Sequence, residues 1–115
     1  MRKENLTFDD LELSLKKIEG EKVHVVGDLI IDTFTNTTMI GGQTKTPTIS
    51  VLFNNKQDYV GGAGIVAKHL NKAGADVTFT TVVGDDHLAE FAYNDLLNEN
   101  IKVNFIKDET RPTTN

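Results

Sequence analysis

The stretch Tyr59-Val60-Gly61-Gly62-Ala63-Gly64-Ile65-Val66-Ala67-Lys68-His69-Leu70 joins a glycine-rich turn directly to an amphipathic helix. Apolar residues recur at helical spacing and predict one buried helix face: Ala63, Val66, Ala67, Leu70 and Ala73. The glycines let another molecule approach the backbone, because no Cβ stands in the way. The start of the helix would turn unpaired N–H groups toward whatever occupies the turn. The stretch therefore predicts either a site for a ligand with oxygen atoms, such as a sugar or a phosphate, or a plain reversal of the chain.

The composition is that of one ordinary domain. The chain has 115 residues, no cysteine and a formal net charge of −5. The lack of cysteine excludes disulfides, thiol catalysis and cysteine-based zinc sites. The negative charge disfavours nucleic acid and anionic membranes as partners. The sequence contains no signal-peptide pattern and no apolar stretch of membrane length, so we expect a soluble, cytoplasmic setting with no nucleic-acid or membrane partner.

Two elements, a helix and a strand, are expected in the first 31 residues. The apolar spacing from Phe8 to Ile18 predicts a helix that Thr7 caps and Gly20 ends, and we expect it to cover the sheet. Residues 22–31 form an apolar, β-branched run, which is typical of a central parallel strand buried on both faces. Asp28 interrupts this run near its end and Asp32 closes it. Carboxylates at the carboxyl end of such a strand lie where open α/β sheets bind ligands, although each of the two could instead be a turn or cap acceptor, an alternative that suits Asp28 better than Asp32.

Residues 33–60 are predicted to form a small β-flap. The segment is rich in threonine, Thr48–Phe53 is typical of a strand, and Asn54-Asn55 is a turn signal. Short strands inserted here would project from the sheet as a lid with exposed edges. Such edges need a partner, and a second copy of the chain is the simplest one.

The remaining elements alternate between strand and helix. Asp76–Val83 and Val103–Ile106 are predicted strands, and between them a helix begins at Asp85 or Asp86 and stops at Asn100. The expected core face of that helix is Leu88, Phe91, Ala92 and Leu96. The alternation predicts an α/β fold with a parallel, Rossmann-like sheet and helices on both faces. About three core strands are few for such a fold, so we expect residues 1–115 to be an incomplete, N-terminal portion of a larger enzyme.

Other chemistries fit less well. Gly62 to Ala67 satisfy the G-x-G-x-x-A pattern of a dinucleotide-binding Rossmann domain, but polar residues 54–59 precede it where a buried strand is required. A P-loop is excluded because no G-K-[ST] occurs. The three histidines are scattered and predict no metal site.

Several segments in this order resemble the N-terminal portion of the ribokinase-like (PfkB) carbohydrate kinase family. The resemblance spans about residues 20 to 115 and is strongest to its heptose-7-phosphate kinase branch, found in ADP-heptose synthases. The segments that carry it, besides the threonine-rich flap, are Val25 to Asp32, Gly61 to Gly64, Gly74 to Val77 and Val82 to Asp86.

The resemblance implies transfer of the γ-phosphoryl group of ATP, with Mg²⁺, to a sugar or sugar phosphate. It implies that Asp32 accepts hydrogen bonds from sugar hydroxyls, as an acceptor-only carboxylate can. It also implies that the flap closes over the sugar and pairs with a second subunit in a homodimer. The substrate-binding residues that it implies are Asp28, Asp32, Gly61, Gly62 and Gly64.

Two departures from the family pattern matter. Ile65 (or Val66 in the other spacing) stands where family members usually carry an Asn that contacts the sugar. The catalytic base of the family lies in a later Gly-x-Gly-Asp segment that this chain lacks, so we expect no catalytic or metal-binding residue here and no activity of the chain alone. The alternative hypothesis is a non-catalytic α/β module that binds a ligand or a partner.

Overall fold

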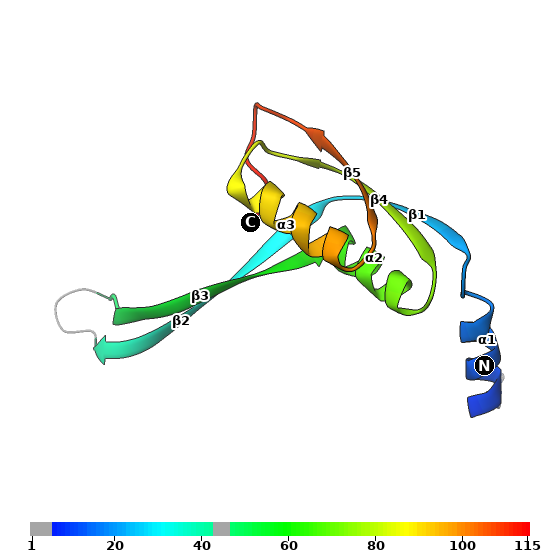
Figure 1. The fold of residues 1–115 in the computed structure, drawn as a ribbon. Helices are drawn as coiled ribbons and strands as arrows, with labels where there is room; N and C mark the ends of the chain where they lie inside the picture. The colour runs from blue at the N-terminus through cyan, green and yellow to red at the C-terminus, as the bar shows by residue number, and fades with distance from the viewer. Residues whose placement is uncertain (1–5, 43–46) are drawn as a thin grey trace.

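The computed structural model describes residues 6–42 and 47–115. The described part comprises one parallel sheet, one projecting β-ribbon and three helices (Figure 1). In chain order the elements are α1 (Phe8–Lys16), β1 (Lys22–Val26), β2 (Leu29–Gly41), β3 (Ser50–Gly62), α2 (Ala63–Lys72), β4 (Asp76–Val83), α3 (His87–Asn98) and β5 (Lys102–Lys107).

The parallel sheet has the strand order β1-β4-β5 and confirms the predicted α/β architecture. Both α2 and α3 cover one face of it, where Val77 and Phe79 of β4 are fully buried. Ion pairs from Lys68 of α2 to Asp95 of α3 and to Glu99, the C-cap of α3, hold the two helices side by side. On the opposite face His24 Nε2 lies 2.8 Å from Thr80 Oγ1, and no helix of the described residues covers this face.

The prediction of one central strand over residues 22–31 is wrong. The run breaks at Gly27-Asp28 into β1 of the parallel sheet and β2 of the ribbon. Two contacts with the start of α2 hold the break: a Cβ on Gly27 would lie 2.9 Å from Ala63 Cβ, and the Asp28 carbonyl accepts the Ala63 N–H at 2.9 Å. β1 is consequently an edge strand of the described sheet, and β4 is the central one.

The ribbon pairs β2 and β3 in antiparallel fashion from Leu29↔Gly62 to Gly41↔Ser50. It confirms a projecting flap, but each strand has 13 residues rather than the short strands expected. The prediction of a turn at Asn54-Asn55 is wrong, because both residues lie within β3. There the register shifts, since Asn36 pairs with Asn55 and Thr37 pairs with Phe53. Asn54 is the additional residue of a β-bulge, which lets a polar pair with turn propensity continue the strand.

The helices follow the sequence signals in part. Thr7 caps α1 in a capping box with Asp10, as its position predicts, but α1 buries none of its residues and covers no sheet, so that expectation is wrong. In α2 the buried residues are Gly64 and Ala67, whereas Val66, predicted to be in the core, is 49% exposed. Asp86 caps α3, whose buried residues include Leu88, Ala92 and Leu96. Asn100 follows with a φ of 62°, as expected for a left-handed stop.

Candidate functional site

Asp32 and Gly61 lie against each other on one face of the ribbon. Ile30 pairs with Gly61 and Asp32 pairs with Tyr59, so Asp32 is the diagonal neighbour of Gly61. A Cβ on Gly61 would overlap the Asp32 Oδ2 atom. The absence of a side chain at Gly61 therefore lets the carboxylate lie directly on the backbone, while the side chain of Asp32 stays exposed. The structure brings these two predicted site residues together.

Gly62 forms the corner between β3 and α2. Its φ of 57° is in the region that favours glycine, and a Cβ there would lie 2.5 Å from the Asp28 carbonyl oxygen. The Asp28 backbone thus serves the helix start, while its side chain is exposed. Asp28 and Gly62 therefore shape the corner beside the Asp32–Gly61 pair.

Gly64 is placed differently from the other glycines. It is buried, and a Cβ on it would lie 2.5 Å from Val60 Cγ1 and 3.0 Å from Leu29 Cδ1. Gly64 thus packs α2 against the base of the ribbon rather than facing the Asp32 carboxylate. Ile65, the next residue, is half-buried in the first turn of α2.

The first turn of α2 carries no acidic residue, and among the described contacts no side chain caps it. Its N-cap is Gly62. A helix start of this kind presents partial positive charge to its surroundings. This turn lies next to the Asp32–Gly61 pair in sequence and in space, so a carboxylate and a positive helix end border the same corner.

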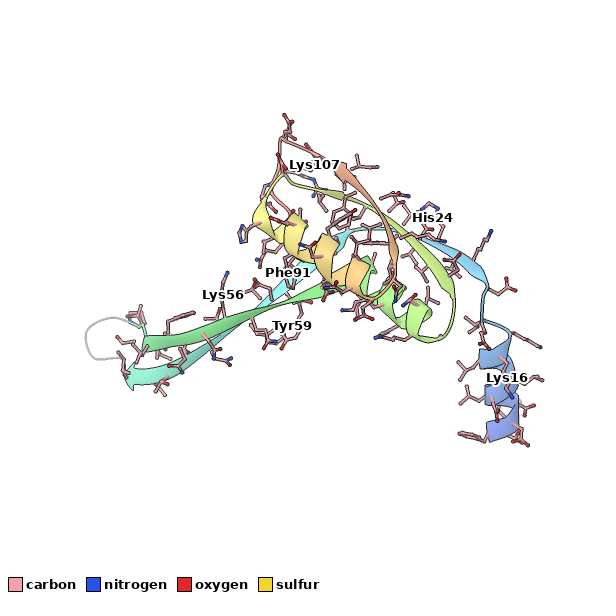
Figure 2. The ribbon with its side chains drawn as sticks, viewed as in Figure 1. Lys16, His24, Lys56, Tyr59, Phe91 and Lys107 are labelled. Atoms are coloured by element: carbon pink, nitrogen blue, oxygen red, sulfur yellow. The ribbon has the colours of Figure 1, made fainter. Side chains whose placement is uncertain are left out.

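An aromatic pair extends the face that carries Asp32. Phe34 and Tyr59 lie on that face, because side chains two apart along a strand point the same way and Tyr59 is the cross-strand partner of Asp32. Their rings meet edge to face with centroids 5.5 Å apart, yet they remain 61% and 46% exposed (Figure 2 labels Tyr59). With Asn36 and Gln57 they line a shallow hollow of about 480 Å³. This aromatic pair was not predicted from the sequence. Phe34 follows Asp32 by two residues, and on a strand that spacing places both side chains on the same face.

The C-terminal segment forms a second group of contacts that the sequence analysis did not single out. Thr113 is only 4% exposed, and its N–H donates to Asp86 Oδ2 at 2.8 Å. The hydrogen bond from the Thr113 N–H, with those from Ala89 and Leu88, holds the pKa of Asp86 below its usual range, although burial opposes this. The Thr114 carbonyl accepts the Ile31 N–H at 2.8 Å. The segment thus connects the start of α3 to the base of the ribbon.

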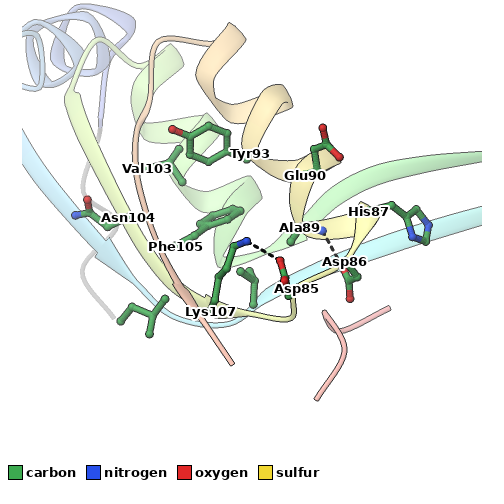
Figure 3. Close-up of a pocket in the computed structure, with 12 residues that line it drawn as sticks. Asp85, Asp86, His87, Ala89, Glu90, Tyr93, Val103, Asn104, Phe105 and Lys107 are labelled. Carbon is green, nitrogen blue, oxygen red and sulfur yellow. Dashed lines mark hydrogen bonds and ion pairs between the residues drawn. The ribbon is translucent and has the colours of Figure 1, made fainter. Parts of the chain in front are cut away.

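A larger cavity, of about 890 Å³, lies between α3 and β5 (Figure 3). Tyr93 and Phe105 pack edge to face in its wall, and Lys107 Nζ pairs with Asp85 at 2.5 Å at its rim. The hydrogen bond that Lys107 donates to Asp85 raises the pKa of Lys107. None of the site residues predicted from sequence lines this cavity, because they lie around the base of the ribbon.

Residues 6–42 and 47–115 contain no group of three or more His, Asp or Glu side chains that could hold a metal ion. No helix within the described ranges is long and apolar enough to cross a membrane.

Sequence comparison relates the chain to carbohydrate kinases. The model of the pfkB family carbohydrate kinase matches residues 20–115. A bifunctional protein HldE of Rhodopseudomonas palustris is 33% identical over 111 residues, which are 94% of this chain and 22% of that protein. A D-beta-D-heptose 7-phosphate kinase of Bordetella bronchiseptica is 30% identical over 101 residues, 86% of this chain and 32% of that kinase. The chain thus spans between a fifth and a third of the length of these relatives.

Solved structures show the same fold. A carbohydrate kinase from Agrobacterium tumefaciens superposes with a TM-score of 0.63 at 17% identity, over 81% of this chain and 29% of that one. A nucleoside kinase from Methanocaldococcus jannaschii, described as an archaeal member of the ribokinase family, gives a TM-score of 0.57 at 23% identity, over 79% of this chain and 30% of that one. At these identities the likeness concerns the fold alone, and it confirms the ribokinase-like architecture expected from the sequence.

Proposed function

The chain belongs to the pfkB family of carbohydrate kinases, and we propose that it forms the sugar-binding side of a kinase that phosphorylates a sugar phosphate such as heptose 7-phosphate. The proposed substrate follows the two relatives above, one of which is named a heptose 7-phosphate kinase. The reaction is that of the whole protein, since the chain spans only part of their length.

The contact between Asp32 and Gly61 is the observation that carries the proposal. An exposed carboxylate offers only hydrogen-bond acceptors and can receive two sugar hydroxyls at once. Because Gly61 has no side chain, the carboxylate packs directly on its buried backbone, which would hold the exposed carboxylate in place for a sugar.

The neighbouring groups suit the other parts of a sugar phosphate. The exposed rings of Phe34 and Tyr59 would pack against the C–H surface of the sugar, which is apolar. The first turn of α2, which has no acidic residue, would favour a negatively charged phosphate. Ile65 would supply an apolar contact where an Asn is usual, which favours a substrate that makes fewer hydrogen bonds at this position.

The remaining machinery is not assigned to residues of this chain. ATP and Mg²⁺ would bind to parts of the kinase outside residues 1–115. The catalytic base would also lie outside these residues, so the chain alone would be inactive. The ribbon would act as the lid over the sugar and pair with a second copy in a homodimer, in a cytoplasmic enzyme.

Substitution of Asp32 tests the proposal in the complete kinase that carries this chain. Asp32→Asn keeps the size of the side chain but replaces one acceptor oxygen by a donor. We expect the KM for heptose 7-phosphate to rise about 10- to 100-fold, the usual cost of a lost hydrogen bond to a charged group, while the KM for ATP stays within about twofold. Asp9→Asn is the matched control, because Asp9 belongs to α1, which lies away from the base of the ribbon (Figure 1).

Two results would contradict the proposal. Unchanged sugar kinetics in Asp32→Asn would remove Asp32 from the site. A complete wild-type protein that binds sugars without ATP-dependent turnover would instead support the non-catalytic module. A panel of sugar phosphates and free sugars, assayed by ADP release, would identify the preferred substrate.

A further inference from the structure

The C-terminal segment, residues 111–115, passes between two parts of the fold that are distant in sequence (Figure 1). We call it the tail strap. At one end it packs against the turn between β4 and α3, and at the other it reaches the base of the ribbon.

The strap is tightly fixed at the turn. Gly84 N–H donates to Thr113 Oγ1 at 3.1 Å, and Thr113 N–H donates to Asp86 Oδ2. A Cβ on Gly84 would lie 2.6 Å from the Thr113 nitrogen and 2.8 Å from the Arg111 carbonyl oxygen. The fit leaves no room for a side chain at position 84, so the turn and the strap are built around each other.

The carboxylate of Asp86 has two separate tasks. Its Oδ1 atom accepts the N–H groups of Leu88 (3.1 Å) and Ala89 (2.9 Å), which caps α3. Its Oδ2 atom accepts only from the strap among the described contacts. Capping needs just one of these oxygens, so the second one is available to fix the strap.

At the ribbon the strap holds both neighbours of Asp32. The Thr114 carbonyl accepts the Ile31 N–H, and Asn115 Nδ2 donates to Thr33 Oγ1 at 3.1 Å. Thr33 Oγ1 in turn donates to Asp58 Oδ1 on β3 at 2.6 Å. The Ile31 bond fixes the backbone at the edge of β2, and the Thr33 side chain is held on the face opposite to Asp32, because successive side chains of a strand point to opposite faces. The backbone on both sides of Asp32 is thereby fixed.

We propose that the tail strap, anchored by Asp86 and Thr113, is a positioning element that holds Asp32 against Gly61 for sugar binding. The inference rests on the proposed function for its catalytic consequence, and on the contacts above for its structural part. In this proposal Asp86 and Thr113 act through the backbone at Ile31 and the side chain at Thr33, and not through a contact with the sugar.

Two variants disrupt the strap by different routes. Asp86→Asn keeps an oxygen for the α3 cap and turns an NH₂ group toward the Thr113 N–H. Both groups are hydrogen-bond donors, so the bond between residue 86 and Thr113 is lost. Gly84→Ala removes no hydrogen bond directly but inserts a methyl group into the strap. Thr113→Ser retains the hydroxyl that accepts from Gly84 and is the conservative control.

The structural part is measured by NMR on the isotope-labelled 115-residue chain. In both disrupting variants we expect the Ile31 amide to exchange about 10-fold faster, while the Phe79 amide in β4 is unchanged. We also expect the nuclear Overhauser effect between the Asp32 Hβ and Gly61 Hα protons to weaken. Thr113→Ser should behave as wild type in both measurements.

The functional part is measured in the complete kinase with heptose 7-phosphate. The sugar KM should rise about 10-fold in the disrupting variants, with kcat and the ATP KM little changed. An unaltered Asp32–Gly61 signal in both variants would overturn the proposal, as would sugar and ATP KM values that rise together. If the wild-type enzyme does not phosphorylate any sugar, the proposed function fails, and the NMR result still decides whether the strap positions Asp32.

Discussion

The carboxylate of Asp32 occupies the space that a side chain at Gly61 would need. The two residues are diagonal neighbours across the ribbon, where Asp32 pairs with Tyr59 and Gly61 pairs with Ile30. Either residue alone has an ordinary explanation, as a strand aspartate or a turn glycine. Their contact joins two separate sequence features into one site, in which an exposed carboxylate packs on the backbone of the buried Gly61.

Gly61→Ala should displace the Asp32 carboxylate. Gly61 is not among the described residues with positive φ, so the effect is steric and not a matter of backbone strain. We expect the free energy of unfolding to fall by about 1–3 kcal/mol, as for other overpacked sites, when it is measured by urea denaturation of the chain.

A double mutant identifies the cause. With Asp32→Ala in the background, the methyl group at position 61 has room, so most of the destabilisation should disappear. If the double mutant loses as much unfolding free energy as the two single mutants together, the clash involves the Ile30 carbonyl or another neighbour instead.

Thr81→Val should destabilise the junction between the sheet and the ribbon. Thr81 is 3% exposed, and its Oγ1 accepts the buried Leu29 N–H at 3.1 Å. Valine has the same shape but leaves that N–H without an acceptor, which costs about 1–3 kcal/mol of unfolding free energy. Denaturant unfolding measures the loss, and Thr78→Val on the open face of the same strand is the control. Equal effects of the two substitutions would argue against a special role for the Leu29 hydrogen bond.

The elements that local signals define were predictable. β4, β5 and α3 follow from apolar periodicity, an aspartate cap and a left-handed Asn100, and the structure confirms all three. The break at Gly27-Asp28 was not predicted, because apolar residues resume at Leu29 and continue to Ile31, so the interruption by Asp28 was interpreted as lying within one strand. Its cause is the packing of Ala63 against Gly27, a contact between residues far apart in sequence.

The same distinction applies to the site. Asp32 and the glycine turn were identified from the sequence, but the reason they meet was wrong, since Asp32 lies in the ribbon and not at the end of a central strand. Asn54-Asn55 has turn propensity, yet pairing with β2 overrides it. The strap contacts of Thr113 depend on how the chain returns to Gly84 and Ile31, which no local pattern encodes.

Asp86 should make stability depend on pH in acid. The Thr113 N–H is the largest cause of its lowered pKa, followed by the N–H groups of the α3 cap, while burial acts in the opposite direction. An unfolded aspartate titrates near pH 3.9, so below about pH 5 the unfolded chain takes up the proton more readily than the folded one. The contribution of Asp86 is therefore present above that range and is lost as the pH falls through its lowered folded-state pKa.

Urea unfolding between pH 3 and pH 7 checks this sign. Asp86→Asn should be less stable than wild type at pH 7, with a difference that narrows toward pH 3. Asp85→Asn removes a carboxylate one residue away that pairs with Lys107 at the surface, and it should change stability less. A constant difference between Asp86→Asn and wild type across the pH range would show that ionisation of Asp86 does not contribute.

The outer half of the ribbon should mediate self-association. It exposes apolar side chains on a two-stranded element that is rarely stable alone, among them Met39, Val51, Leu52 and Phe53. A two-fold dimer would bury these side chains and cover the free strand edges.

Val51 and Leu52 point to opposite faces of β3, so Val51→Lys and Leu52→Lys report which face is used. Sedimentation velocity at several concentrations should show a dimer that one of the two substitutions weakens at least about 10-fold. Leu11→Lys is the control, because α1 also exposes leucines. A dimer that only Leu11→Lys weakens would move the interface from the ribbon to α1.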